Sequence, residues 1–328
     1  MPLTPPEDLS KSAGIIFLHG ILIVRYGKTY KNDEELAELL ISRGLVATKR
    51  QLLELFKAVG YYRFSGYLVP FKLTDSDNYA PETSFNRVWE IYTFDRKLRL
   101  MAMDALARIE IAVRALIAKY HAEAYPSDPF CYKDASSLPG LSTKRHADLL
   151  VSIKRSVKNA RTDADIAHMQ KAYGITDYPP IWCMLEHVPF GVVTLYYEGL
   201  APLIKQKVAN TFFIQPNAFL GVLMTFKNAR NICAHHSRFW NRHILSRIAK
   251  SLGVRTELQP LMECLSRQNS SNYTTIFSVL SLCAHCIGYV RPQSKWPTRC
   301  KALLETADSF ILHGMGVPEN WTELQLWR

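Results

Sequence analysis

The segment from Phe85 to Ala124 contains neither glycine nor proline, and it constrains the fold of the chain more than any other feature. Apolar residues recur along it at steps of three and four positions, among them Val88, Ile91, Tyr92, Leu98, Met101, Ala105, Ile109, Ala112 and Leu116. This spacing brings apolar side chains to one face of an α-helix. The segment therefore predicts one long core helix against which the rest of the chain packs.

Capping residues and glycine stops predict shorter helices on both sides of the long one. Asn32 or Asp33 begins a helix that ends at Gly44, and Thr48 begins a second helix. A turn-rich stretch, 61–83, then leads into the long helix. Further helical patterns occupy 147–159, 182–187, 215–227 and two or three segments after residue 257. Because alternating strand patterns are few, we expect an all-α chain.

We expect four parts along the chain. An N-terminal extension (1–26) precedes an N-terminal helical subregion (27–82), a helical core (83–255) and a helical C-terminal extension (256–328). Residues 15–24 form an apolar run, but a membrane span needs about 20 apolar residues. A signal peptide is not expected, because the leader is proline-rich and acidic and no small-residue cleavage site follows. The run is then an early strand or helix packed on the rest of the chain, or a poorly ordered extension.

The positive charge of the chain is concentrated in one segment. The protein has a net charge of +11, from 40 Lys and Arg residues against 29 Asp and Glu. No acidic residue occurs from 199 to 256, whereas the basic residues there are Lys205, Lys207, Lys227, Arg230, Arg238, Arg242, Arg247, Lys250 and Arg255. The rest of the chain is close to neutral. Such a segment favours an anionic partner, nucleic acid first, and we expect no membrane partner.

The seven cysteines do not form the pattern of a secreted disulfide framework, so we expect free thiols and a cytoplasmic location. Cys283, His285 and Cys286, with Cys264 or Cys300, invite a zinc interpretation. Their apolar helical surroundings and the lack of a second close pair favour buried structural thiols instead. We expect neither a metal nor another cofactor.

One motif within the acid-free segment combines the residue types needed to cleave RNA. Arg230, Asn231 and His235 lie close together in sequence. On a continuous helix, one face would carry Asn231, His235, Arg238 and Arg242. Imidazole can take the proton from a 2′-hydroxyl, and arginine can stabilise the charge of a phosphorane. No paired carboxylates of the kind that hold Mg²⁺ occur near the motif, which argues against a two-metal nuclease.

The same residues also allow an interpretation without chemistry. A basic helix rich in histidine can be a solvated face, or it can hold phosphates without cleaving them. The choice of histidine is open as well, since His236 directly follows His235. We favour His235 because it lies one helical turn after Asn231.

The motif and four other blocks resemble a known family. Residues 230–235 resemble the Arg, Asn, His signature of HEPN-domain ribonucleases, and the run through Arg242 is similar to the Abi-like (abortive infection, AbiD/AbiF type) bacterial family. The other blocks, in the family's order, are 60–67 with Pro70 and Phe71, 92–99, 108–110 with Arg114, and 180–182 with Glu186, Phe190 and Gly191. The resemblance covers about residues 27–243.

The resemblance implies a HEPN-like helical bundle and a metal-independent endoribonuclease, with a composite site formed by two copies, usually a homodimer. It also implies a role in phage defence, as an abortive-infection or toxin–antitoxin effector, and association with a structured noncoding RNA. By position, Arg230 and His235 would be the catalytic pair, Asn231 would contact the phosphate and His236 is the alternative base. The residues expected to bind RNA are Lys227, Arg238, Asn241, Arg242 and His243. The alternative function is a non-catalytic RNA-binding module that holds such an RNA.

Two pairs on the long helix have the spacing of an i, i+4 ion pair. Glu110 and Arg114 form either an ordinary ion pair or a support for the motif. HEPN proteins often place a polar residue of such a helix beside the motif, where it would orient the motif's arginine or histidine. For Asp95 and Arg99 we favour a purely structural pair.

An aromatic block surrounds Arg63 and comprises Tyr61, Tyr62, Phe64 and Tyr67. Such rings can stack on RNA bases. We favour a core position, with the hydroxyl groups at its edge.

Overall fold

Helices dominate the described part of the chain, as the sequence predicts. The computed structural model describes residues 15–18, 21–24, 29–245, 258–265 and 273–328. The chain divides into two compact units, residues 1–90 and 91–328, and the boundary between them along the sequence falls within helix α4 (Phe85–Ala124). The boundaries predicted at 26 and 255 lie outside the described residues, as do Arg247, Lys250 and Arg255.

The first unit contains a short hairpin and three helices that precede α4. Strands β1 (Ile15–Leu18) and β2 (Ile21–Val24) pair antiparallel, so the apolar run forms strands. Helices α1 (Asp33–Ser42) and α2 (Lys49–Ala58) begin at Asn32 and Thr48, which confirms both predicted starts. Each start is a capping box, in which side chain and backbone of the first and fourth residues exchange hydrogen bonds.

Helix α3 (Tyr61–Leu68) occupies part of the stretch predicted to be turn-rich, so that prediction was wrong for these residues. The cause is the aromatic block, which tertiary packing holds in a helix despite its glycine. Phe64 and Tyr67 are buried in the unit's core, whereas Tyr62 is 91% exposed. The block is therefore core on one face, and one ring reaches solvent.

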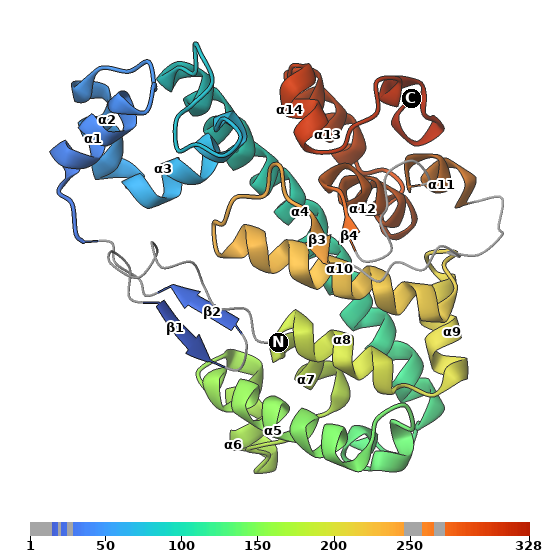
Figure 1. Ribbon diagram of the computed structural model, residues 1–328. Helices are drawn as coiled ribbons and strands as arrows, with labels where there is room; N and C mark the ends of the chain where they lie inside the picture. The colour runs from blue at the N-terminus through green and yellow to red at the C-terminus, as the bar shows by residue number, and fades with distance from the viewer. Residues whose placement is uncertain (1–14, 19–20, 25–28, 246–257, 266–272) are drawn as a thin grey trace, which may run out of the picture. The chain divides into compact units, whose positions relative to one another are not determined.

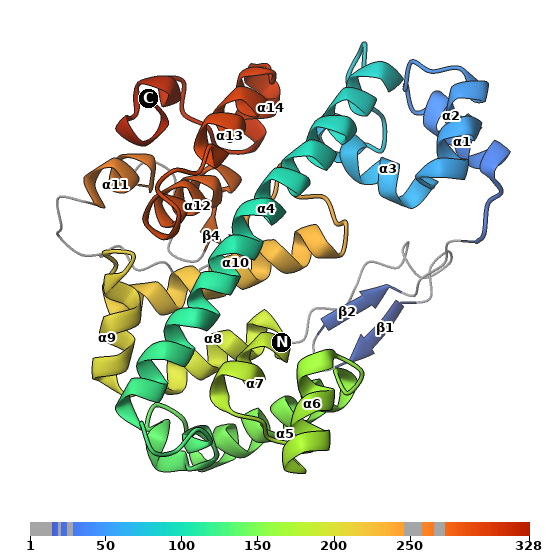
Figure 2. The same ribbon diagram turned by 180° about the vertical axis from the view of Figure 1, so that it is seen from behind.

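The second unit is a helical bundle built on α4 and α10 (Pro216–Ala234). The observed bounds of α4 confirm the predicted long helix, and its fully buried residues keep the helical spacing: Leu98, Ala102, Ala105, Ile109, Val113 and Ile117. Helix α4 crosses α10 in both views (Figures 1 and 2). Between them in sequence lie α5 (Thr143–Asn159), α6 (Ala164–Tyr173), α7 (Ile181–His187), α8 (Phe190–Gly199) and α9 (Pro202–Asn210). Helix α10 packs on α8 and α9.

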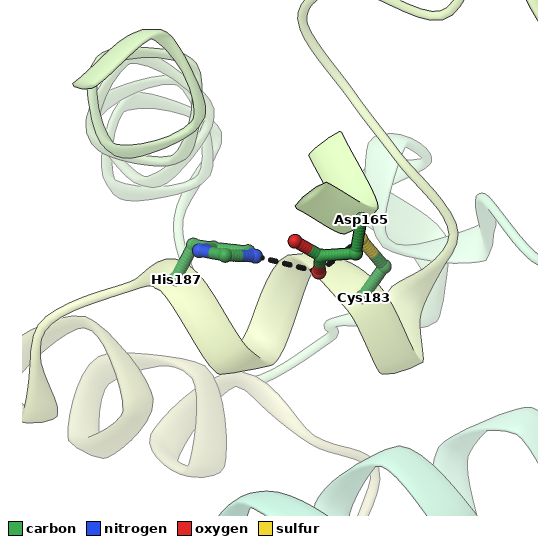
Figure 3. A group of neighbouring side chains, drawn as sticks. All are labelled: Asp165, Cys183 and His187. Carbon is green, nitrogen blue, oxygen red and sulfur yellow. Dashed lines mark hydrogen bonds and ion pairs between the residues drawn. The ribbon is translucent and has the colours of Figure 1, made fainter. Parts of the chain in front are cut away.

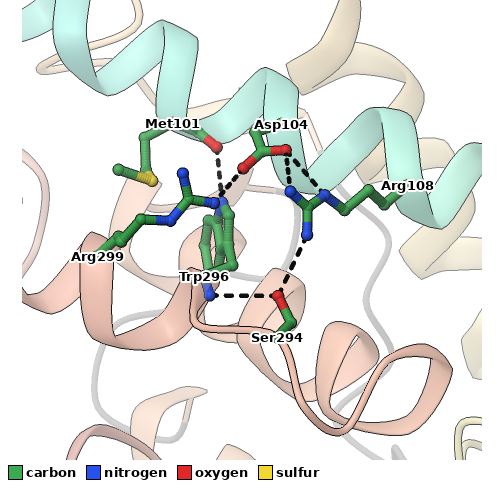
Figure 4. Close-up of polar contacts among 6 residues, drawn as sticks. All are labelled: Met101, Asp104, Arg108, Ser294, Trp296 and Arg299. Atoms are coloured by element: carbon green, nitrogen blue, oxygen red, sulfur yellow. Dashed lines mark hydrogen bonds and ion pairs between the residues drawn. The ribbon is translucent and has the colours of Figure 1, made fainter.

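The C-terminal extension belongs to the same bundle. Its elements are α11 (Gln259–Leu265), α12 (Ile276–Val290), α13 (Trp296–Glu305), α14 (Ser309–Gly314) and a two-residue pairing of β3 (Ile244–Leu245) with β4 (Tyr273–Thr274). Figure 4 shows how α13 is joined to α4. The indole of Trp296 donates to the Met101 carbonyl at 2.8 Å, and Asp104 accepts from Arg299 at 2.5 Å and from Arg108 at 2.7 Å. These contacts fix the extension on the long helix.

The cysteines of the zinc interpretation are buried. Cys283 and Cys286 lie in α12, and like Cys264 and Cys300 they form no disulfide. His285 donates from Nε2 to the Phe212 carbonyl at 2.9 Å, which gives this histidine a structural role. Among the described helices, none has the length and apolar content required to cross a membrane.

Candidate functional site

Helix α10 ends in the middle of the motif. Ala234 is its last residue, and the amide of His235 still donates to the Asn231 carbonyl at 3.0 Å. His236 then adopts the left-handed conformation, with φ 54°, its amide donates to Cys233 and that of Ser237 donates to Ile232. This pattern is a Schellman motif, in which the left-handed position is usually glycine. A histidine there costs about 1–2 kcal/mol of backbone strain, a feature often found at functional sites.

The helix end corrects one prediction from the sequence. Arg238 and Arg242 do not share a helical face with Asn231 and His235, because the chain leaves the helix at His236. The prediction assumed a continuous helix and overlooked this stop, since no glycine marks it. The chain instead turns back, and the side chain of Asn228 on α10 donates to the Leu245 carbonyl at 3.0 Å.

A buried carboxylate on α4 holds this turn. Asp95 is fully buried, pairs with Arg99 and accepts hydrogen bonds from the amides of Phe239 at 3.2 Å and Trp240 at 2.7 Å. The spacing of Asp95 and Arg99 predicted the ion pair. The contacts of Asp95 with backbone amides were not predicted, because Phe239 lies 144 residues away in the sequence and no local pattern indicates it. Asp95 therefore positions the segment that follows His235.

The C-terminal extension supports the same turn through Trp240. This side chain is buried, and its indole donates to the Ile311 carbonyl at 2.9 Å. A Cβ atom at Gly314 would lie 2.9 Å from three atoms of the indole ring, so the ring packs directly on the backbone of α14. The motif's turn is thus fixed on one side by α4 and on the other by α14.

Replacing Gly314 by alanine should destabilise the protein. The added methyl group would collide with the rigid indole of Trp240, and such overpacking costs about 1–3 kcal/mol. Urea denaturation measures this as a lower unfolding midpoint. Gly288→Ala in α12 is the matched control, because a Cβ atom there meets nothing within 4 Å and alanine favours the helix. Equal midpoints for the two variants would contradict the packing described here.

The arginine of the motif contacts Glu110 on α4. Its Nε atom lies 3.6 Å from Glu110 Oε2, whereas Glu110 Oε1 accepts from Arg114. Arg114 also donates to the carbonyls of Leu185 and, at 2.9 Å, Glu186 at the end of α7. Glu110 and Arg114 are buried, but the side chain of Arg230 is 37% exposed. The guanidinium of Arg230 is therefore anchored from within and still accessible to an anion.

The other predicted site residues lie mostly at the surface. Asn231, His235, His236, Arg242 and His243 are exposed. Lys227, Arg238 and Asn241 are half-buried, and Asn241 adopts a left-handed conformation with φ 49°, which asparagine tolerates. The end of α10 and its turn thus gather polar and basic side chains around His235.

The cysteine within the motif has no nucleophilic role. Burial, and to a smaller extent the nearby Asp95 carboxylate, raises the pKa of the Cys233 thiol to about 12. The thiol is therefore protonated at neutral pH and packs as an apolar side chain.

A comparison with protein families matches one family. The model of the family described as Abi-like protein matches residues 54–241, more than half of the chain, and this range includes α4, α7 and the motif up to Asn241. No curated protein and no solved structure matches the chain.

Proposed function

Because the chain belongs to the Abi-like protein family, we propose that it is a metal-independent endoribonuclease acting in phage defence by abortive infection. One observation carries the proposal: the last turn of α10 presents an accessible Arg230, held by Glu110, and an exposed His235 at the helix end. Cation and imidazole are the two groups that a metal-free cleavage of RNA requires.

The proposed reaction is a transesterification. His235 takes the proton from the 2′-hydroxyl, whose oxygen attacks the neighbouring phosphorus. The bond from phosphorus to the 5′-oxygen breaks, and this oxygen takes a proton from water to leave as a hydroxyl group. Arg230 neutralises the negative charge that develops on the phosphorane, and Asn231 contacts a phosphate oxygen. Glu110 holds the guanidinium in place and does not touch the RNA, because its carboxylate is buried.

Two copies of the chain together form the proposed site. At 100° per residue, positions 230 and 235 point about 140° apart on a helix, so one copy presents its arginine and its histidine in different directions. Pairing two helix ends would bring the arginine of one copy to the histidine of the other. The exposed surface around His235 is accessible to such a partner.

The RNA-binding part of the proposal predicts a change in salt dependence. Arg242→Ala should weaken RNA binding and lower the slope of log K against log salt concentration by about one, because one phosphate contact is lost. Binding measured by fluorescence anisotropy at several salt concentrations tests this. Lys158→Ala, at an exposed lysine of α5 outside the acid-free segment, should leave the slope unchanged. Equal slopes for both variants would contradict a role for Arg242.

The metal-free reaction has a direct test. Purified protein is mixed with labelled RNA of mixed sequence, with and without EDTA, while circular dichroism follows whether it stays folded. We expect cleavage in both samples. Loss of cleavage in folded, EDTA-treated protein that Mg²⁺ restores would contradict the mechanism, and absence of cleavage with retained binding in both samples would favour the RNA-binding module.

A further inference from the structure

A mixed cluster of side chains joins α6 to α7 and contains none of the residues of the proposed reaction. Asp165, Cys183 and His187 each offer one ligand atom, and these atoms all lie within 4.8 Å of one another (Figure 3). Asp165 Oδ2 lies 2.8 Å from His187 Nε2 and 3.4 Å from Cys183 Sγ. Cys183 and His187 are one turn apart on α7, so both point toward the start of α6.

The donor set fits zinc. Sulfur, nitrogen and oxygen ligands at about 2.0–2.3 Å form its usual tetrahedral site, and soft thiolate with imidazole disfavours Mg²⁺ and Ca²⁺. Ligand atoms of such a tetrahedron are roughly 3.3–3.8 Å apart. The 3.4 Å from Asp165 to Cys183 lies in this range, the 2.8 Å from Asp165 to His187 is shorter, and all three ligand atoms lie within 4.8 Å of one another, so small side-chain movements would complete the geometry. The side chains of Cys183 and His187 are largely shielded, whereas that of Asp165 is 48% exposed, which gives an ion a route from solvent.

A second carboxylate lies behind the histidine. Asp163 Oδ2 is 3.4 Å from Nδ1 of His187, the ring nitrogen that faces away from the cluster. Zinc-bound histidines commonly donate this second N–H group to a carboxylate, which fixes the ring and raises its basicity. Asp163 contacts His187 from outside the cluster and takes no part in the hydrogen bonds among Asp165, Cys183 and His187.

We propose that Asp165, Cys183 and His187 bind one Zn²⁺ ion, with Asp163 orienting His187 and water in the fourth position. Zinc binding replaces the hydrogen bonds of Cys183 and His187 with Asp165. The Cys183 thiol releases its proton to solvent and binds as a thiolate, and His187 coordinates through Nε2. The ion then links α6 to α7. The backbone carbonyls of Leu185 and Glu186 on α7 accept hydrogen bonds from Arg114, which also pairs with Glu110. By holding α7 in place, the zinc site therefore supports the pair of Arg114 and Glu110.

Cobalt substitution tests the site without any RNA. Protein stripped of metal is titrated with Co²⁺, which gives strong visible bands in a tetrahedral site and a near-ultraviolet charge-transfer band when a thiolate binds. We expect saturation at about one ion per chain with both signals, and displacement of the cobalt by Zn²⁺.

Variants identify the ligands. Cys183→Ser should abolish the charge-transfer band, whereas Cys131→Ser, at another buried cysteine, should retain it. His187→Gln should weaken zinc binding at least about tenfold, and Asp163→Asn about tenfold. Asp165→Asn keeps the shape of the side chain, and Zn²⁺ should raise the melting temperature of the wild type but not of this variant. A wild type without the charge-transfer band, or a band that persists in Cys183→Ser, would overturn the proposal, and either result leaves the proposed ribonuclease activity untouched.

Discussion

Replacing His235 by alanine should lower the rate of RNA cleavage by about 10²- to 10⁴-fold, the usual contribution of a general base. RNA binding should persist, because the basic side chains around His235 remain in place. Single-turnover cleavage of labelled RNA, with binding measured on the same preparation, separates the two effects. His235 is exposed at the end of α10, so the substitution should not disturb the fold.

The neighbouring histidine provides the discriminating variant. His236 has a positive φ, the conformation that glycine adopts most readily, so His236→Gly should preserve the helix end and relieve its strain. If His235 is the base, His236→Gly should still cleave RNA. An active His235→Ala protein together with an inactive His236→Gly protein would assign the base to His236. Equal cleavage by His235→Ala and the wild type, with His236→Gly also active, would remove both histidines from the reaction.

Replacing Asp95 by alanine should lower the free energy of unfolding by about 3–5 kcal/mol, the cost of breaking a buried ion pair. The change leaves Arg99 as an uncompensated charge in the core and removes the acceptor for the amides of Phe239 and Trp240. Chemical denaturation measures the loss. Cleavage should fall as well at temperatures where the variant remains folded, because the turn after His235 loses its anchor.

The control for this variant is an ion pair with the same spacing at the surface. Glu54→Ala breaks the i, i+4 pair with Arg50 on α2, where both side chains are mainly in solvent. Exposed pairs contribute little to stability, so its unfolding midpoint should hardly change. If Asp95→Ala were as stable as Glu54→Ala, the carboxylate would have no part in holding the motif.

Local sequence signals predicted most of the helices. The long periodic run of α4 and the capping residues Asn32 and Thr48 act within one or two turns of their own position. Helix α3 was not predicted, because the burial of Phe64 and Tyr67 stabilises a helix where the local sequence favours a turn. Local rules are thus sufficient where packing agrees with them.

The site required contacts that no local pattern reveals. The sequence marked Arg230 and His235 by a motif and Glu110 by a spacing, but the anchoring of the turn depends on Asp95 and Trp240, which bind residues far along the chain. The group of Asp165, Cys183 and His187 likewise joins two helices. Only the i, i+4 spacing of the cysteine and the histidine gave a signal in the sequence.

The chemistry of the RNA ends tests the central claim most directly. RNA cut by the purified wild-type protein is analysed for its termini by mass spectrometry and by end-labelling. Attack of a 2′-hydroxyl activated by His235 leaves a 2′,3′-cyclic phosphate on one fragment and a free 5′-hydroxyl on the other. We expect these ends, and no cleavage when the nucleotide before the scissile bond lacks its 2′-hydroxyl. Fragments with 5′-phosphate ends, or cleavage of the 2′-deoxy substrate, would contradict a metal-free site built on Arg230 and His235.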